Sequence, residues 1–179
     1  MTKLIIDCET TGLSPVIKIT DAVGHISREH RRLLCISILN IETGVISSFY
    51  GENEKQFLID FFEFLDNRKP VSEIIGFNSQ FDINFIKVRS FFHSIKISPQ
   101  FLFAKKTDLR KAISEDKYAV GTLKFWAETF GAKSITEDGS KMSEMYEKGD
   151  WDSIREHSEE DVKLTQLLFN KCAECNLIK

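Results

Sequence analysis

The order of apolar segments along this chain restricts its fold more than any other feature. Three short apolar runs, rich in β-branched residues, come first at residues 3–8, 33–41 and 45–50, and a Glu-Thr-Gly turn at 42–44 joins the last two. Segments typical of helices and strands then alternate along the rest of the chain. An antiparallel beginning followed by this alternation predicts an α/β domain with a mixed sheet flanked by helices.

The spacing of apolar residues also locates the later elements. Residues 14–32 are polar and irregular, which predicts a long connection of the kind that often carries function. The chain has 179 residues and no internal repeat, so we expect residues 1–179 to form one domain. We expect two more strands, at 73–77 and 101–103, for five in all, and helices at 54–66, 81–92, 122–130, 142–147 and 151–172.

Composition excludes several classes of protein. With 42% hydrophobic residues the chain is not disordered, and its apolar runs are too short to cross a membrane. We expect a cytoplasmic protein without a secretory signal and with four reduced cysteines. A net charge of −3 argues against a general coat for nucleic acid. Two basic clusters can still meet phosphates, although a solvated charge run is the better explanation for each by itself: Arg28, Arg31 and Arg32, then Lys105, Lys106, Arg110 and Lys111.

Two carboxylates end the first predicted strand. Side chains alternate along a strand, so Asp7 and Glu9 share one face and Cys8 points into the opposite layer. Residues 10–12, Thr-Thr-Gly, follow with hydroxyl groups and a flexible backbone that suit an anionic ligand. The spacing alone carries no information, and a solvated strand end with a polar turn remains an alternative.

Three further residues have functional and structural interpretations of their own. Asp82 lies where a predicted strand passes into a helix, a place where aspartate is most often a helix cap. His157 and Asp161 are four residues apart, so they stack on one face of the last predicted helix. The acidic residues around them are also typical of a solvated helix face.

Taken together, these segments resemble the DEDD (DnaQ-like) 3′–5′ exonuclease superfamily. The motifs are Asp-x-Glu-Thr-Thr-Gly-Leu at 7–13, Asn-x-x-Phe-Asp at 78–82 and His-x-x-x-Asp at 157–161. The segment 149–162 is most similar to proofreading domains related to family B DNA polymerases. The resemblance implies a ribonuclease H-like fold in which four acids converge at one edge of the sheet: Asp7, Glu9, Asp82 and Asp161.

Four ionised carboxylates in one pocket need a counter-charge. Two such charges 4 Å apart repel by about 4 kcal/mol at an effective dielectric constant of 20. Oxygen ligands suit Mg²⁺ or Mn²⁺, and two ions per site can both activate water and stabilise a leaving oxygen. The resemblance therefore implies hydrolysis of the 3′ ends of single-stranded or frayed DNA to nucleoside 5′-monophosphates.

Other functions remain open from the sequence. Trimming of RNA 3′ ends by the same chemistry is one alternative, and a non-catalytic domain that binds nucleic acid or docks a partner is another. A polymerase or another replication or repair protein is a candidate partner. A zinc site formed by Cys172, Cys175, His25 and His30 is a weaker alternative, because one Cys-x-x-Cys pair with distant partners is a poor signal.

His157 departs from the family pattern. One subclass has a tyrosine four residues before the last aspartate, and the other has a histidine five residues before it. Here a histidine occupies the tyrosine spacing, so it can serve as the general base for the attacking water, merely orient that water, or be a surface residue. By motif match, the resemblance assigns contacts with the substrate to Thr10, Thr11, Gly12, Leu13, Asn78 and Phe81, although a place in the hydrophobic core is an alternative for Phe81.

Overall fold

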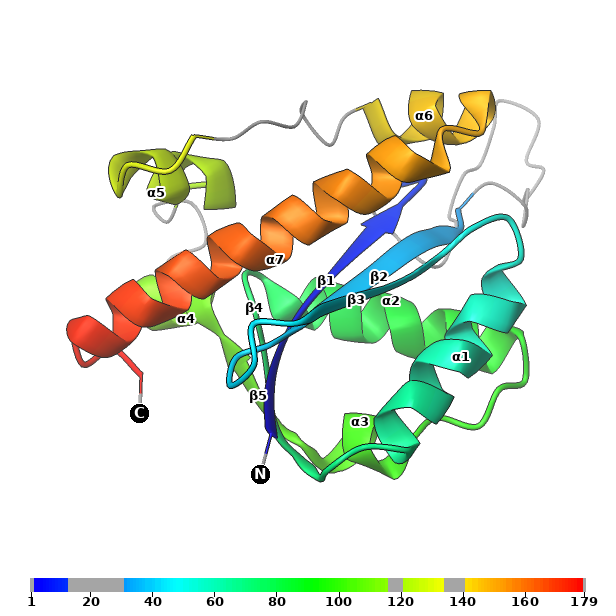
Figure 1. Ribbon diagram of the computed structural model, residues 1–179, viewed down its shortest axis with the longest axis horizontal. Coiled ribbons are helices and arrows are strands. Elements are labelled where there is room, and N and C mark those ends of the chain that lie inside the picture. The colour runs from blue at the N-terminus through cyan, green and yellow to red at the C-terminus, as the bar shows by residue number, and fades with distance from the viewer. Residues whose placement is uncertain (1, 13–30, 116–120, 134–140, 179) are drawn as a thin grey trace.

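The computed structural model describes residues 2–12, 31–115, 121–133 and 141–178, and its centre is one five-stranded sheet (Figure 1). The strand order is β3-β2-β1-β4-β5, with β1 antiparallel to β2, β2 antiparallel to β3, and β1, β4 and β5 parallel. This mixed sheet flanked by helices confirms the predicted fold class. The strands are β1 (Thr2–Thr10), β2 (Leu33–Asn40), β3 (Ile46–Tyr50), β4 (Val71–Gly76) and β5 (Lys105–Asp108).

Three helices cover one face of the sheet, namely α1 (Glu54–Asp66), α2 (Ser79–Phe92) and α3 (Pro99–Phe103). Alternation along β1 sends Leu4, Ile6 and Cys8 into this layer, where they meet phenylalanines such as Phe61 and Phe85. Phenylalanines at helical spacing on α1 contribute to this core together with Phe85 of α2, as their periodicity predicts, whereas Phe92 at the end of α2 is 57% exposed.

The opposite face is covered chiefly by the long helix α7 (Trp151–Glu174), which runs diagonally across the strands (Figure 1). Ile5, Leu39 and Ile75 of the sheet pack here against Val162 and Leu168 of α7. Two shorter helices, α4 (Leu109–Ile113) and α5 (Leu123–Thr129), join this layer, and α6 (Met142–Lys148) packs beside the start of α7. None of the described helices combines the length and hydropathy needed to cross a membrane.

The strand predicted at 101–103 is wrong. Residues 101–103 belong to α3, because the Ser98 side chain caps the Gln100 amide and Pro99 occupies the first helical turn, where its missing N–H is harmless. The fifth strand is β5, four residues further on, and it pairs with Glu73–Gly76 of β4.

Candidate metal centre

The end of β1 supplies two acids to the face that α7 covers. Glu9 is 8% exposed and Asp7 is half-buried, whereas Cys8 lies in the opposite core, as strand alternation predicts. The pairing of β1 with β2 shifts register between Glu9 and Thr10, so the regular ladder ends just beyond these acids. The pairing of β1 with β4 stops earlier, at Ile5.

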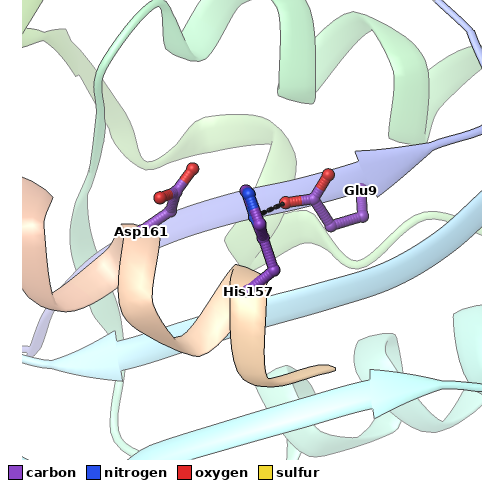
Figure 2. Close-up of side chains that lie close together, drawn as sticks. All are labelled: Glu9, His157 and Asp161. Carbon is purple, nitrogen blue, oxygen red and sulfur yellow. Dashed lines mark hydrogen bonds and ion pairs between the residues drawn. The ribbon is translucent and has the colours of Figure 1, made fainter. Parts of the chain in front are cut away.

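Helix α7 brings His157 and Asp161 to the same place. The Asp150 side chain caps this helix by accepting from the Ser153 amide, and the buried residues of the helix fall on the side that faces the sheet. His157 Nδ1 lies 2.8 Å from Glu9 Oε1. Figure 2 shows His157 and Asp161 projecting from α7 beside Glu9, and the ligand atoms of these three residues all lie within 4.8 Å of one another.

Asp7 and Asp82 adjoin this three-residue group without being part of it. Ser158 Oγ donates to Asp7 Oδ2 over 3.0 Å, and the Cys8 amide donates to Asp82 Oδ1 over 2.9 Å. Asp82 is not the helix cap that its position suggested, because Asn78 occupies the N-cap of α2 and Asp82 lies in the first turn. Its buried carboxylate reaches across to the backbone of β1.

A glycine allows this approach of α2 to β1. A Cβ atom on Gly76 would lie 2.9 Å from the Ser79 Cβ and 3.0 Å from the Ile6 carbonyl oxygen. Any larger residue at the end of β4 would therefore push the start of α2, and Asp82 with it, away from the first strand.

The acids perturb one another strongly. Burial raises the pKa of Asp7 well above its usual range, and the charges of Glu9, Asp161 and Asp82 raise it further, against a hydrogen bond from Ser158 that lowers it. Burial raises the pKa of Asp82 to about 7. Burial likewise raises the pKa of Asp161 to about 7, although His157 lowers it. Burial is the largest cause of all three shifts, and repulsion between neighbouring carboxylates adds to it, so the acids lie close together in a poorly solvated place.

This donor set fits a divalent cation. Carboxylate oxygens and an imidazole nitrogen are the usual protein ligands of such ions. Among the described residues, His157 beside Glu9 is the basic side chain paired with one of the four acids, and no lysine or arginine is, so a bound cation would supply further positive charge.

The Thr-Thr-Gly turn after β1 lies beside this centre, and its polar groups bond within the chain. Thr10 Oγ1 donates to the Gly12 carbonyl over 2.8 Å, and Thr11 Oγ1 accepts from the Arg32 amide over 2.8 Å. A Cβ on Gly12 would come within 3.2 Å of the Arg31 side chain, so this position has little spare room. Leu13 lies outside the described residues.

The second motif places its two predicted substrate residues at the start of α2. Asn78 is exposed, adopts a left-handed conformation with φ of 65°, and donates its amide to Asp108 Oδ1 over 2.9 Å. Phe81 is half-buried and packs against Phe85, with ring centroids 5.6 Å apart. Asp108 also caps α4 by accepting from the Arg110 amide, as its position predicts.

The first basic cluster is only partly described. Arg28 lies outside the described residues, and Arg31 is half-buried. Arg32 donates to the Tyr146 hydroxyl over 2.7 Å and to the Glu52 carbonyl over 2.6 Å. The interpretation of Arg32 as part of a solvated charge run is therefore wrong, because it ties the start of β2 to its neighbours.

The second basic cluster is divided between structural and exposed positions. Lys105 pairs with Glu73 over 2.9 Å, and Lys106 donates to two carbonyls at the end of α3. Arg110 lies beside the start of α2, and Lys111 is exposed.

The four cysteines all lie among the described residues, and no disulfide joins them. Cys172 is buried and Cys175 is exposed, and the group of metal-ligand donors found among the described residues does not include them. The two histidines of the zinc alternative, His25 and His30, lie outside the described residues.

Ser158 is the residue at this centre that the sequence did not single out. It is fully buried and holds Asp7. Its position three residues before Asp161 places both on one helix face, and this spacing is the signal that would have found it.

Comparisons with known proteins relate this chain to others. The uncharacterized protein MJ0365 of Methanocaldococcus jannaschii is 31% identical over 191 residues, covering 100% of this chain and 99% of that protein. The family B DNA polymerase from the hyperthermophilic archaeon Pyrobaculum calidifontis superposes with a TM-score of 0.69 at 18% identity, over 96% of this chain and 24% of that chain. This chain thus spans about a quarter of the polymerase, and the likeness concerns the fold.

A family model covers nearly the whole chain. Residues 4–173 match the model described as RNase_H superfamily, and all five strands and the acidic centre lie between these limits or overlap them. This match supports a nuclease-type function. The chain belongs to the RNase_H superfamily.

Proposed function

We propose that this protein is a metal-dependent 3′–5′ exonuclease that removes nucleoside 5′-monophosphates from single-stranded or frayed DNA. The observation that carries the proposal is the gathering of acids from β1, α2 and α7 around the end of β1, where burial and mutual repulsion raise the pKa of three of them. Acids that a fold keeps together at such a cost are typical of a functional site.

Each acid has a role in this proposal. Asp7, Glu9, Asp82 and Asp161 would hold two divalent cations, Mg²⁺ or Mn²⁺, with carboxylate oxygens. When bound, such ions lower the pKa of a water molecule and stabilise the charge on the leaving 3′ oxygen. Ser158 and the Cys8 amide keep the Asp7 and Asp82 carboxylates oriented through hydrogen bonds of 3.0 and 2.9 Å.

The turn after β1 and the start of α2 flank these acids and are the proposed substrate contacts. Residues 10–13 would hold the terminal nucleotide, and Asn78 and Phe81 would contact the strand that leads to it. The half-buried Phe81 ring presents an apolar surface on which a base can stack without sequence preference. The superposition on a family B DNA polymerase favours DNA over RNA as substrate.

The test is the release of mononucleotides from a 3′-labelled DNA oligonucleotide with Mg²⁺ or Mn²⁺, with and without chelator. The parent should release mononucleotides, the chelator should stop release, and Asp161→Ala should be inactive. Asp152→Ala is the matched control, because Asp152 lies exposed on the same helix and should leave the rate unchanged. The same measurement on an RNA oligonucleotide of matched sequence shows whether DNA or RNA is the better substrate. If neither is degraded with any metal, the protein is instead a non-catalytic domain that binds nucleic acid or a partner.

A further inference from the structure

One residue of the centre brings nitrogen into a site that the carboxylates alone would make entirely of oxygen. We propose that His157 is a direct ligand of the bound cation, through Nδ1, and that the site therefore selects divalent first-row transition metals such as Mn²⁺ over Mg²⁺. This inference rests on the proposed function and names the class of metal that the same centre takes.

The distances suit shared coordination. Two ligand atoms bound side by side on an octahedral cation at about 2.1 Å lie roughly 3 Å apart. His157 Nδ1 and Glu9 Oε1 are 2.8 Å apart, and Asp161 completes a group whose donor atoms all lie within 4.8 Å (Figure 2). A small contraction around a cation would bring one nitrogen and two oxygens onto the same ion.

The imidazole is buried and lies within hydrogen-bond distance of Glu9. His157 is 7% exposed, so its ring cannot swing freely into solvent, and Glu9 beside it is 8% exposed. His157 and Asp161 lie one helical turn apart on α7, a spacing that directs two side chains towards one ion. The acid at the end of β1 faces them from the sheet, so both elements contribute to a preformed group.

Charge distinguishes this histidine from a merely structural partner of glutamate. The other His–Glu contact joins His93 to Glu54 over 3.0 Å, but Arg89 also donates two hydrogen bonds to that carboxylate. The guanidinium already supplies the positive charge there. Among the described residues, the charged groups that interact with His157 and Glu9 at this centre are acids, so a cation can neutralise negative charge here.

The chemistry of the donors sets the selectivity. Mg²⁺ and Mn²⁺ both take oxygen ligands, but Mg²⁺ retains much of its water and has little affinity for nitrogen, whereas Mn²⁺, as a transition metal, also accepts an imidazole nitrogen. Replacing a tyrosine, which the related motif has at this spacing, by histidine therefore adds affinity for Mn²⁺ with little gain for Mg²⁺.

The experiment measures metal binding directly in the full chain after metal removal. Titration with Mn²⁺, followed by electron paramagnetic resonance and with Mg²⁺ as competitor, gives both dissociation constants. We expect His157→Ala and the closer isostere His157→Gln to weaken Mn²⁺ binding by about tenfold or more and to change Mg²⁺ binding by less than about threefold. Pulsed resonance on the parent should show coupling between Mn²⁺ and an imidazole ¹⁴N nucleus, and both variants should lose it.

His93→Ala is the matched control, since it removes an imidazole from the other His–Glu contact and should leave Mn²⁺ binding and the ¹⁴N coupling unchanged. Thermal melting checks that each variant is folded. Absence of ¹⁴N coupling in the parent, or equal losses of Mn²⁺ and Mg²⁺ affinity in the His157 variants, would overturn the inference. A parent that shows the coupling but degrades no oligonucleotide would instead overturn the proposed exonuclease activity and leave the ligand assignment standing.

Discussion

Two histidine–glutamate contacts in this molecule look alike but sit in opposite electrostatic settings. His93 meets Glu54 over 3.0 Å at the start of α1, and His157 meets Glu9 over 2.8 Å at the end of β1. Both glutamates are buried. Glu54 also bonds Arg89 and the Leu33 amide, so its charge is satisfied within the protein.

The pKa of Glu54 and the pKa values of the acids near His157 shift in opposite directions. Burial alone would raise the pKa of Glu54, but the hydrogen bonds from Arg89 and His93 outweigh it and the pKa is lowered. Burial and neighbouring carboxylates raise the pKa of Asp7, and Asp161 rises to about 7. We call Glu54 with Arg89 and His93 the balanced group, because basic partners compensate its buried carboxylate, and this is typical of a structural contact. We call Asp7, Glu9, Asp82 and Asp161 the unbalanced group, because carboxylates outnumber their basic partners there, and this is typical of a ligand-binding site.

The largest expected effect comes from removing an acid of the unbalanced group. Asp7→Ala or Asp161→Ala should reduce mononucleotide release to the background level, because either change removes oxygen ligands from the cations. The metal-free protein should melt at the same temperature as the parent or higher, since repulsion between the carboxylates is relieved. A large loss of thermal stability would instead show that these acids have a structural role, as Glu54 does.

Removing a charge from the balanced group should lower the stability of the protein and leave its metal binding unchanged. Arg89→Ala leaves Glu54 buried without its main counter-charge, and such changes cost about 3–5 kcal/mol of unfolding free energy. Thermal or denaturant unfolding measures this loss. Mn²⁺ affinity should not change in the fraction that remains folded, and a matching loss of Mn²⁺ binding would show that the two groups are coupled.

The two groups should also respond differently to pH in the metal-free protein. The pKa values of Asp82 and Asp161 are raised from 3.8 to about 7, so these acids favour the folded state when protonated. That stability is fully present below about pH 4 and is lost as pH rises through about 7. The melting temperature in chelator should therefore fall by several degrees between about pH 5 and pH 8.

Saturating Mn²⁺ should remove or reverse this fall, because the cation binds the ionised acids of the folded state. Glu54 does not contribute to this fall in melting temperature, because the pKa of Glu54 is lowered in the folded protein. The stability that Glu54 provides is lost only in more acidic solutions, as the pH decreases. Asp161→Asn should flatten the profile in chelator. An unchanged slope in that variant would contradict the assignment of the slope to this group.

The smallest expected effect is that of Ser158→Ala. This change removes one hydrogen bond to Asp7, worth about 1 kcal/mol, from a carboxylate that the bond helps to keep ionised. Metal affinity should weaken by about fivefold with little change in melting temperature. Ser158→Thr keeps the hydroxyl and should retain the metal affinity of the parent. Unchanged metal binding in Ser158→Ala would remove Ser158 from the site.

Much of the fold could be predicted from periodicity. The hairpin that joins β2 to β3, the phenylalanine stripe of α1 and the long helix α7 follow from local spacing, and so does the placement of Asp7 and Glu9 on one face. The prediction of a strand at 101–103 was wrong because Ser98 and Pro99 start a helix there. Their capping signal outweighs the apolar character of the segment.

The amino-acid sequence by itself thus determined which residues carry acid and imidazole groups, and on which face of its own element each lies, because strand and helix periods are local properties. Only the tertiary structure decided three contacts: His157 lies within hydrogen-bond distance of Glu9, Ser158 donates a hydrogen bond to Asp7, and the Asp82 carboxylate accepts one from the backbone of β1. These contacts join residues 74 to 151 positions apart. Their geometry depends on how α2 and α7 pack against the sheet, and no local pattern encodes that packing.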